Sequence, residues 1–266
     1  MTLAPGALAL LALAAFAAGV IDAVAGGGGL ITVPALLAAG LPPHLALGTN
    51  KGQSVFGSGA SLLRFARAGL VDARRAQVAF PGGFAGALCG AALVLLLRPA
   101  VLRPIVLLLL IAVALFMAFR PSLPAMIAQP GEAPSHRRWP VAVRHARGAT
   151  LLIALAIGAY DGFFGPGTGT FLIVAFALVL GDGLTRASGE AKVVNFASNL
   201  AALAIFASRG VVVWQVALPM AAAQFAGSTL GAHLAVRRGD AFVRRVVLLV
   251  VLALVVKLAR DLLSAR

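Results

Sequence analysis

The chain has 266 residues, of which 61% are hydrophobic and 11% charged, and its mean hydropathy is +1.00. Soluble domains carry about 25% charged and 45–50% apolar residues, so this composition excludes a soluble globular protein, a disordered chain and a fibrous protein. The net charge of +14 does not indicate nucleic-acid binding, because the basic residues are not interleaved with aromatic ones. We therefore predict an all-α integral membrane protein whose partner is the lipid bilayer.

Ten apolar segments follow one another along the chain. A helix needs roughly 20 residues to cross a bilayer, so the eight long segments are candidate spans. Each of the two short segments follows a glycine-rich stretch and is predicted to be a half-helix that can be re-entrant. The first segment is expected to be a retained span, because a secretory signal needs a positively charged start. The long segments lie near residues 3–25, 52–70, 76–97, 102–119, 148–164, 190–208, 212–236 and 242–260, and the short ones at 30–41 and 170–180.

The two halves of the chain resemble each other. Asp22 recurs as Asp161 at an offset of 139, and Lys51 recurs as Lys192 at an offset of 141. Over residues 51–92 the second offset gives 13 identities in 42 aligned positions (13/42, about 31%). Self-similarity of this kind is the sign of an internal duplication. We predict a first transmembrane repeat over 1–119, a basic linker over 120–147 and a second transmembrane repeat over 148–266.

The distribution of arginine predicts how the two repeats are oriented. Basic residues gather in three clusters, at 64–75, in the linker, and at 237–245. An excess of Lys and Arg marks the cytoplasmic side. Placing all three clusters inside requires the two repeats to be inverted, with about five helical segments each. The linker is then cytoplasmic and the N-terminus lies outside.

A glycine-rich break after Asp22 is the first candidate site. Consecutive glycines cannot easily continue a helix, and they let a ligand approach the backbone closely. A helix restarting near Leu30 would point its partly positive N-terminus at the break, and the second half repeats this arrangement after Asp161. We predict an anion site between the two restarted helices, the alternative being a kink at which helices cross closely. The residues assigned to it are Gly26, Gly27, Gly28, Gly29, Gly165, Gly167, Thr168 and Gly169.

Two equivalent lysines with neighbouring amides form the second candidate site. Lys51 follows Asn50, and Lys192 shares one helix face with Asn195 and Asn199. A lysine at the start of an apolar segment can also extend its amine to the membrane surface. Polar residues along one face of a span usually point into the bundle, so we assign all five residues to substrate binding or to ion pairs inside the protein.

Asp22 and Asp161 are costly within a membrane unless they are paired or hydrated. They can pair with the lysines, cap the restarted helices or carry protons, and the sequence leaves these three roles open. We expect no catalytic residue, no metal and no cofactor. The single cysteine, Cys89, excludes Cys-based metal sites and is expected to be a small packing residue.

Glycines at four-residue spacing mark two segments in which helices can approach closely. They occur over 82–90 and, in the second half, over 227–231. We expect these faces to pack against each other or against the site helices, and a homodimer contact through them is possible.

Each half of the chain carries a long ordered motif. The first half carries Gly19-x-x-Asp22-Ala-x-Ala-Gly-Gly-Gly-Gly-Leu-Ile-Thr-Val-Pro34 and Gly48-Thr-Asn-Lys51. The second half carries Tyr160-Asp-Gly-Phe-Phe-Gly-Pro-Gly-Thr-Gly-Thr170 and Lys192-x-x-Asn195-x-x-Ser-Asn199. These motifs resemble those of the sulfite exporter TauE/SafE family, and the resemblance covers roughly residues 15–260. The resemblance implies a multi-span transporter in the inner membrane of a bacterial cell that exports sulfite, a sulfonate or another organosulfur anion.

We therefore expect a secondary transporter of a small anion that works by alternating access around a midplane site. Inverted repeats with short, glycine-interrupted segments at matching places are typical of such transporters. The alternatives are an anion channel and, less favoured, a membrane-embedded enzyme. A channel would conduct without saturation or coupling, and an enzyme would need a catalytic constellation, which the sequence does not show.

Overall fold

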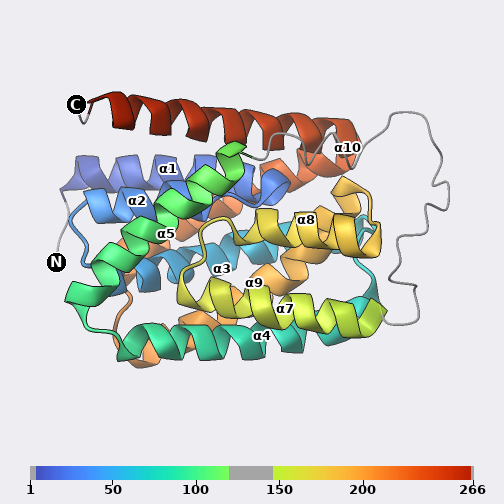
Figure 1. The fold of residues 1–266 in the computed structure, drawn as a ribbon, viewed down its shortest axis with the longest axis horizontal. Coiled ribbons are helices and arrows are strands. Elements are labelled where there is room, and N and C mark those ends of the chain that lie inside the picture. The colour runs from blue at the N-terminus through green and yellow to red at the C-terminus, as the bar shows by residue number, and fades with distance from the viewer. Residues whose placement is uncertain (1–3, 120–145, 265–266) are drawn as a thin grey trace.

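The computed structural model describes residues 4–119 and 146–264, and every regular element in these two ranges is a helix (Figure 1). The backbone leaves the helical region at Gly239 (φ 64°), so α10 consists of two helices that meet there. The first half forms α1 (Pro5–Ala25), α2 (Gly29–Ala38), α3 (Pro43–Arg67), α4 (Ala73–Leu96) and α5 (Pro99–Phe119), and the second half forms α7 (Ala146–Phe163), α8 (Thr168–Leu180), α9 (Leu184–Ser208) and α10 (Trp214–Ser264).

Local sequence explains where several of these helices begin and end. Pro5 and Pro43 occupy first helical positions, where the missing N–H costs nothing. Asp72 caps α4 by accepting hydrogen bonds from the backbone N–H groups of residues 74 and 75. Gly181 ends α8 in the left-handed conformation (φ 73°), which glycine adopts without steric cost.

The described part of the chain has three helices that are long and apolar enough to cross a membrane, namely α1, α4 and α9. The predicted short segments are the helices α2 and α8, of 10 and 13 residues. At 1.5 Å per residue they measure about 15 and 20 Å, less than the roughly 30 Å of a bilayer core. Figure 1 shows α2 turning back beside α1, and α8 turning back toward the end at which α7 begins.

The two halves interlock. The most extensive contacts of α1 are with α10, and those of α7 are with α4, so the first helix of each half lies against a helix of the other half. The central helices α3 and α9 contact each other. Since each of these pairings joins one half of the chain to the other, the halves share one core.

The glycine stripes hold the outer helix pairs together. A Cβ atom added to Gly86 or Gly90 would lie 2.3 or 2.0 Å from a carbonyl oxygen of α7, and one added to Gly227 would lie 2.1 Å from a carbonyl oxygen of α1. Both stripes therefore pack against helices of the same chain, and a homodimer remains a proposal with no surface assigned to it. Cys89 was expected to pack inside, but it lies one position off the stripe of α4 and is exposed.

The central helices begin earlier than the hydropathy predicted. α3 begins at Pro43 instead of near 52, and α9 begins at Leu184 instead of near 190. The two lysines therefore lie in the third turn of each helix, and both are buried. The alternative that the two lysine amines extend to the membrane surface is therefore wrong. The first turns of both helices, although less apolar than the rest, also lie inside the bundle.

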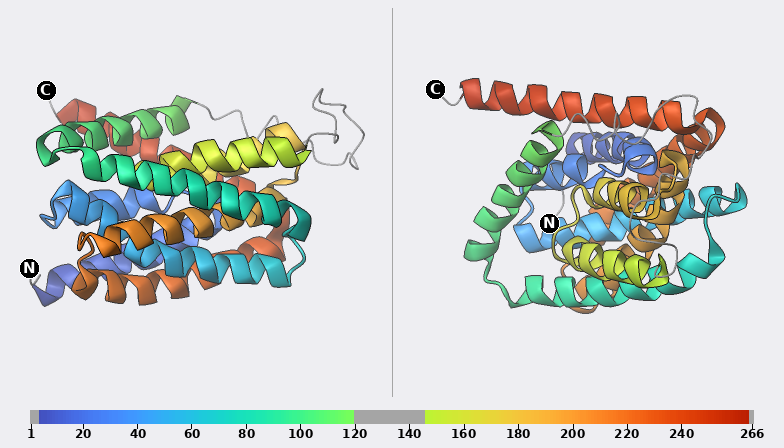
Figure 2. Two further views of the ribbon diagram at one scale, coloured as in Figure 1. Left: turned by 90° about the horizontal axis from the view of Figure 1, so that it is seen from below. Right: turned by 45° about the vertical axis from the view of Figure 1, so that its right-hand side comes forward.

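Arginine-rich segments meet at one end of the bundle, which we call the basic end (described residues 64–75, 146–147 and 237–245). Figures 1 and 2 show the end of α3, the starts of α4 and α7, and the bend of α10 at this end. Arg75 pairs with Asp182 at 2.6 Å across the two halves, and Arg186 lies 3.6 Å from Asp72. Burial raises the pKa of the Asp182 carboxyl above its usual value, although the charge of Arg75 opposes this. Most of the predicted linker, residues 120–145, lies outside the described residues.

Candidate functional site

The two glycine-rich breaks touch each other at the centre of the bundle. A Cβ atom on Gly26 would lie 2.2 Å from the carbonyl carbon of Gly169, and one on Gly169 would lie 2.4 Å from the Cα of Gly26. Gly26 also has a positive φ of 78°. Only glycine satisfies both the conformation and the spacing at this crossing, so the two breaks, which the sequence predicted to face each other, are in direct backbone contact.

Two helix N-termini meet at this crossing. α2 begins at Gly29 and α8 begins at Thr168, and Figure 1 shows the two helices leading away from the centre toward opposite ends. Within the described ranges, the backbone N–H groups of Gly29 and Gly169 have no hydrogen-bond partner. Unpaired N–H groups and the positive ends of two helix dipoles favour a negative charge between them.

A buried ion pair joins α3 to α7 beside the crossing. Lys51 Nζ lies 2.7 Å from Asp161 Oδ1, with side chains only 2% and 5% exposed. Lys51 also donates to Asn199 Oδ1 at 2.9 Å. The Asp161 carboxylate accepts further hydrogen bonds from the hydroxyls of Thr168 and Ser198. Every polar atom of this pair therefore has a defined partner, which a buried pair requires.

The equivalent pair joins α9 to α1. Lys192 Nζ lies 2.8 Å from Asp22 Oδ2 and 2.5 Å from the Asp22 carbonyl oxygen, and the lysine is fully buried. The N–H of Gly28 approaches Asp22 Oδ1 at 3.4 Å. Each lysine thus pairs with the aspartate of the other half. Of the three roles left open for the aspartates, the structure places both in ion pairs with the lysines.

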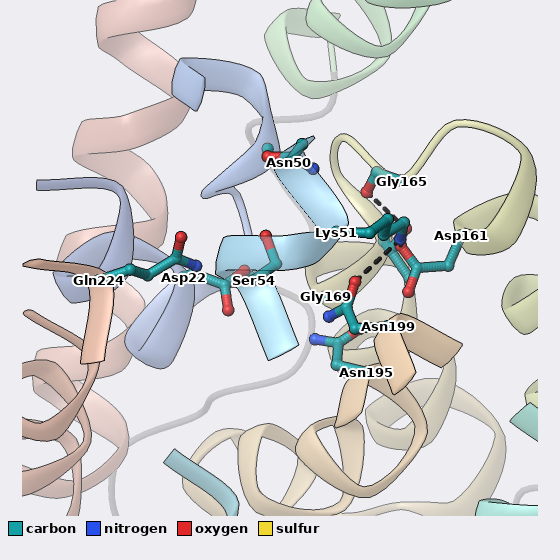
Figure 3. Close-up of a pocket in the computed structure, with 13 residues that line it drawn as sticks. Asp22, Asn50, Lys51, Ser54, Asp161, Gly165, Gly169, Asn195, Asn199 and Gln224 are labelled. Atoms are coloured by element: carbon teal, nitrogen blue, oxygen red, sulfur yellow. Dashed lines mark hydrogen bonds and ion pairs between the residues drawn. The ribbon is translucent and has the colours of Figure 1, made fainter. Parts of the chain in front are cut away.

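A polar cavity lies at the crossing and is lined by Lys51 and Asp161 of the first pair and by Asp22 of the second (Figure 3). Its volume is about 30 Å³, measured over the positions that the centre of a water molecule can occupy, which is room for roughly two or three waters. Predicted residues that do not line it are Gly27, Gly28, Gly167 and Lys192. The lining residues are Asp22, Gly26, Gly29, Asn50, Lys51, Ser54, Asp161, Gly165, Thr168, Gly169, Asn195, Asn199 and Gln224.

Sequence reasoning missed two of the lining residues. Ser54 is the equivalent of Asn195 at the offset of 141, so the repeat alignment could have indicated it. Gln224 has Gly83 as its equivalent and stands alone in an apolar run, and no pattern pointed to it. Figure 3 shows its side chain extending from α10 toward Asp22 and Ser54.

Hydrogen bonds within the first half also fix Asn50. Its Oδ1 atom accepts from Thr32 Oγ1 at 2.6 Å and from Gln53 Nε2 at 3.0 Å. These bonds use only the oxygen of the Asn50 amide. Its nitrogen, which is a donor, is therefore available to a ligand in the cavity that Asn50 lines. Thr32 belongs to α2, so this contact also ties the short helix to α3.

The cavity is lined by charged and polar groups. One ammonium group, two carboxylates, several amides and the starts of two helices surround it, and the second ammonium group, that of Lys192, lies behind Asp22. No group of three or more His, Cys, Asp or Glu side chains that could hold a metal occurs in residues 4–119 and 146–264.

The sequence model of the family described as "Sulfite exporter TauE/SafE" matches residues 11–258. The chain is 40% identical over 254 residues to "Probable membrane transporter protein ORF9" of Sinorhizobium sp., covering 96% of this chain and 93% of that protein. It is 36% identical over 254 residues to a "Probable membrane transporter protein" of Haemophilus influenzae, covering 96% and 95%.

A third relative is "Probable membrane transporter protein YfcA" of Escherichia coli K12, which is 35% identical over 257 residues, covering 97% of this chain and 91% of that protein. No solved structure matches the chain at a comparable level of significance. The family match and the relatives cover nearly the whole chain, so the chain belongs to the sulfite exporter TauE/SafE family and is a membrane transporter.

Proposed function

We propose that the protein is a secondary transporter that exports a small anion, such as sulfite, a sulfonate or another organosulfur anion, by alternating access around the central cavity. The observation that carries this proposal is the pair of buried Lys–Asp contacts that join the two halves where two helix N-termini meet. Buried charges within a membrane protein mark transport pathways, and half-helix N-termini at a repeat interface are typical anion sites of transporters.

We also propose that the halves are inverted repeats, with the basic end in the cytoplasm of a bacterial cell and the N-terminus outside. α1 and α7 lead from opposite ends toward the centre (Figure 1). Two hydrogen bonds at equivalent positions of the two halves also support the inverted arrangement. The N–H of Asp72 donates to Glu190 Oε1 at 2.8 Å, and the equivalent N–H of Val213 donates to Thr49 Oγ1 at 3.0 Å.

In this proposal the substrate binds to Lys51, to the amides of Asn195 and Asn199, and to the free backbone N–H groups of Gly29 and Gly169. The aspartates hold the lysines in place between transport steps. A proton on Asp161 would release Lys51 toward the anion, which makes this aspartate the candidate for proton coupling.

The test is flux into proteoliposomes containing the purified protein, across a panel of sulfite, sulfonates, sulfate and carboxylates, with and without a pH gradient. We expect saturable flux of one or more of the sulfur anions. Lys51→Ala and Lys192→Ala should each abolish it, whereas Arg67→Ala, at an exposed position of the basic end, should not. Unsaturable flux would instead indicate a channel, and normal flux in both lysine variants would overturn the site.

A further inference from the structure

A row of polar residues follows one face of α3 from the cavity toward the basic end. Ser54 lines the cavity, and Gly57, Ser61 and Arg64 follow at intervals of three or four residues, so all four lie on one helix face. This face lies against α10. A Cβ atom on Gly57 would lie 2.6 Å from Gln224 Cγ and 2.8 Å from the hydroxyl oxygen of Ser228.

Three buried polar atoms on this contact have no partner within the described residues: Gln224 Oε1, Ser61 Oγ and Arg64 Nε. The Gln224 residue is 2% exposed and Ser61 is 0% exposed. Leaving a buried polar atom unpaired costs about 1–3 kcal/mol, and such atoms in a folded protein call for an explanation, such as water or a ligand. Here the unpaired atoms form a row between the cavity and the end of the bundle.

A positively charged side chain, that of Arg64, lies where this row reaches the basic end. Arg64 Nη2 lies 2.7 Å from His233 Nδ1 of α10. The Arg64 side chain is half-buried, whereas Arg67, one turn further along, is exposed. Arg64 is thus turned into the α3–α10 contact, with a guanidinium available to an anion that arrives from the basic end.

The equivalent face of the other half is apolar beyond the cavity. At the offset of 141, Ser54 and Gly57 correspond to the polar residues Asn195 and Ser198, but Ser61 corresponds to Ala202 and Arg64 to Ile205. Gln224 and Ser228 correspond to Gly83 and Ala87 on α4. Ala202 is 0% exposed and belongs to an apolar cluster. Beyond the cavity, polar residues therefore continue on one side of the site only, the side that leads to the basic end.

We propose that the α3–α10 contact, through Gln224, Ser61 and Arg64, is the route by which an anion passes between the basic end and the central cavity. Arg64 captures the anion at the entrance, and the hydroxyl and amide groups replace its hydration along the way. The inference rests on the proposed transport of an anion and adds its path and entrance residue.

Cysteine labelling tests the route without any transport measurement. Cys89 is replaced by Ser, and a single cysteine is introduced as Ser61→Cys or, for the matched control, as Ala202→Cys. A membrane-impermeant, anionic methanethiosulfonate reagent is applied to sealed vesicles of either orientation. We expect Ser61→Cys to react from the basic-end side only, and Ala202→Cys not to react. A second reporter, Gln224→Cys, should behave as Ser61→Cys does and keeps the test valid if that variant does not fold.

Equal labelling of Ser61→Cys and Ala202→Cys, no labelling of either reporter, or labelling from the opposite side would overturn the proposal. The labelling result is independent of the flux assay. If neither reporter is labelled but flux remains normal and dependent on the lysines, the proposed route is refuted and the proposed transport function stands. In the flux assay, Arg64→Gln should raise the apparent KM for anion entering from the basic end by about tenfold, the effect of losing roughly 1.4 kcal/mol, while Arg67→Gln leaves it unchanged. Equal KM values in the two variants would remove Arg64 from the entrance.

Discussion

The contact between Lys51 and Asp161 makes the sharpest quantitative prediction. Asp161→Asn keeps the shape of the side chain but leaves the Lys51 ammonium, 2% exposed, without its counter-ion. Lys51→Met leaves the carboxylate, 5% exposed, in the same position. Breaking a buried pair by removing one partner costs about 3–5 kcal/mol, whereas replacing both partners is often close to neutral. We expect each single variant to be strongly destabilised and the double variant to recover most of the loss.

The size of the effect follows from the geometry. With roughly 2–4 °C of melting temperature per kcal/mol for a protein of this size, each single variant should melt about 6–20 °C lower. Two losses of about 3–5 kcal/mol would add to about 6–10 kcal/mol, so a double variant that loses only about 1–3 kcal/mol shows a coupling of about 5–7 kcal/mol. The remaining loss comes from Asp161→Asn, because the amide keeps one oxygen for the two hydroxyls that donate to the carboxylate. The control is Arg186→Gln, whose pair with Asp72 is half exposed at 3.6 Å and should contribute at most about 1 kcal/mol.

Thermal unfolding of the parent and the four variants is followed by the circular dichroism of their helices in detergent micelles, and flux is measured on the same samples. We expect the double variant to be folded but inactive, which separates stability from transport. If the losses of the two single variants simply add in the double variant, the two residues are not coupled. In that case the ion pair would not describe the protein in solution.

The other contacts give three further predictions, each read by thermal unfolding. Gly26→Ala should lose about 2–5 kcal/mol, from a positive φ and a clash at 2.2 Å with the Gly169 backbone, whereas Gly148→Ala, with open space around it, should lose nothing. Arg75→Gln should lose about 1–3 kcal/mol, and the difference from the parent should shrink at high salt, because its pair with Asp182 is partly exposed. Asn50→Ala should lose about 1–3 kcal/mol and lower flux, because Gln53 Nε2 loses its acceptor and Thr32 Oγ1 keeps only the Gly28 carbonyl oxygen, at 3.2 Å.

The helical segments were predictable because hydropathy and glycine act locally. The short helices α2 and α8 were expected from apolar runs too short to span, and both begin within the last residues of the glycine breaks that predicted them. Helix starts were less predictable. α3 begins nine residues before the apolar run, since its first turns are buried by neighbouring helices and not by their own hydrophobicity.

The candidate site was predictable in composition but not in connectivity. Repetition of Asp22 and Lys51 in the second half marked the four charged residues. The sequence could not show that each lysine pairs with the aspartate of the other half, because that depends on how α1 and α7 cross α9 and α3. Gln224 was missed for a related reason, since a single polar residue in an apolar helix carries no periodic signal.

The exchange of partners between the halves connects the architecture to transport. Both ion pairs join one half to the other, so any rigid movement of one half against the other lengthens both pairs together. An uncompensated charge in this buried setting is costly, so the movement needs a substitute for each lost partner. An anion beside a lysine and a proton on an aspartate are the two substitutes that the site can accept. In the proposed mechanism the site therefore favours movement when it is loaded, which is the condition that a coupled transporter must meet.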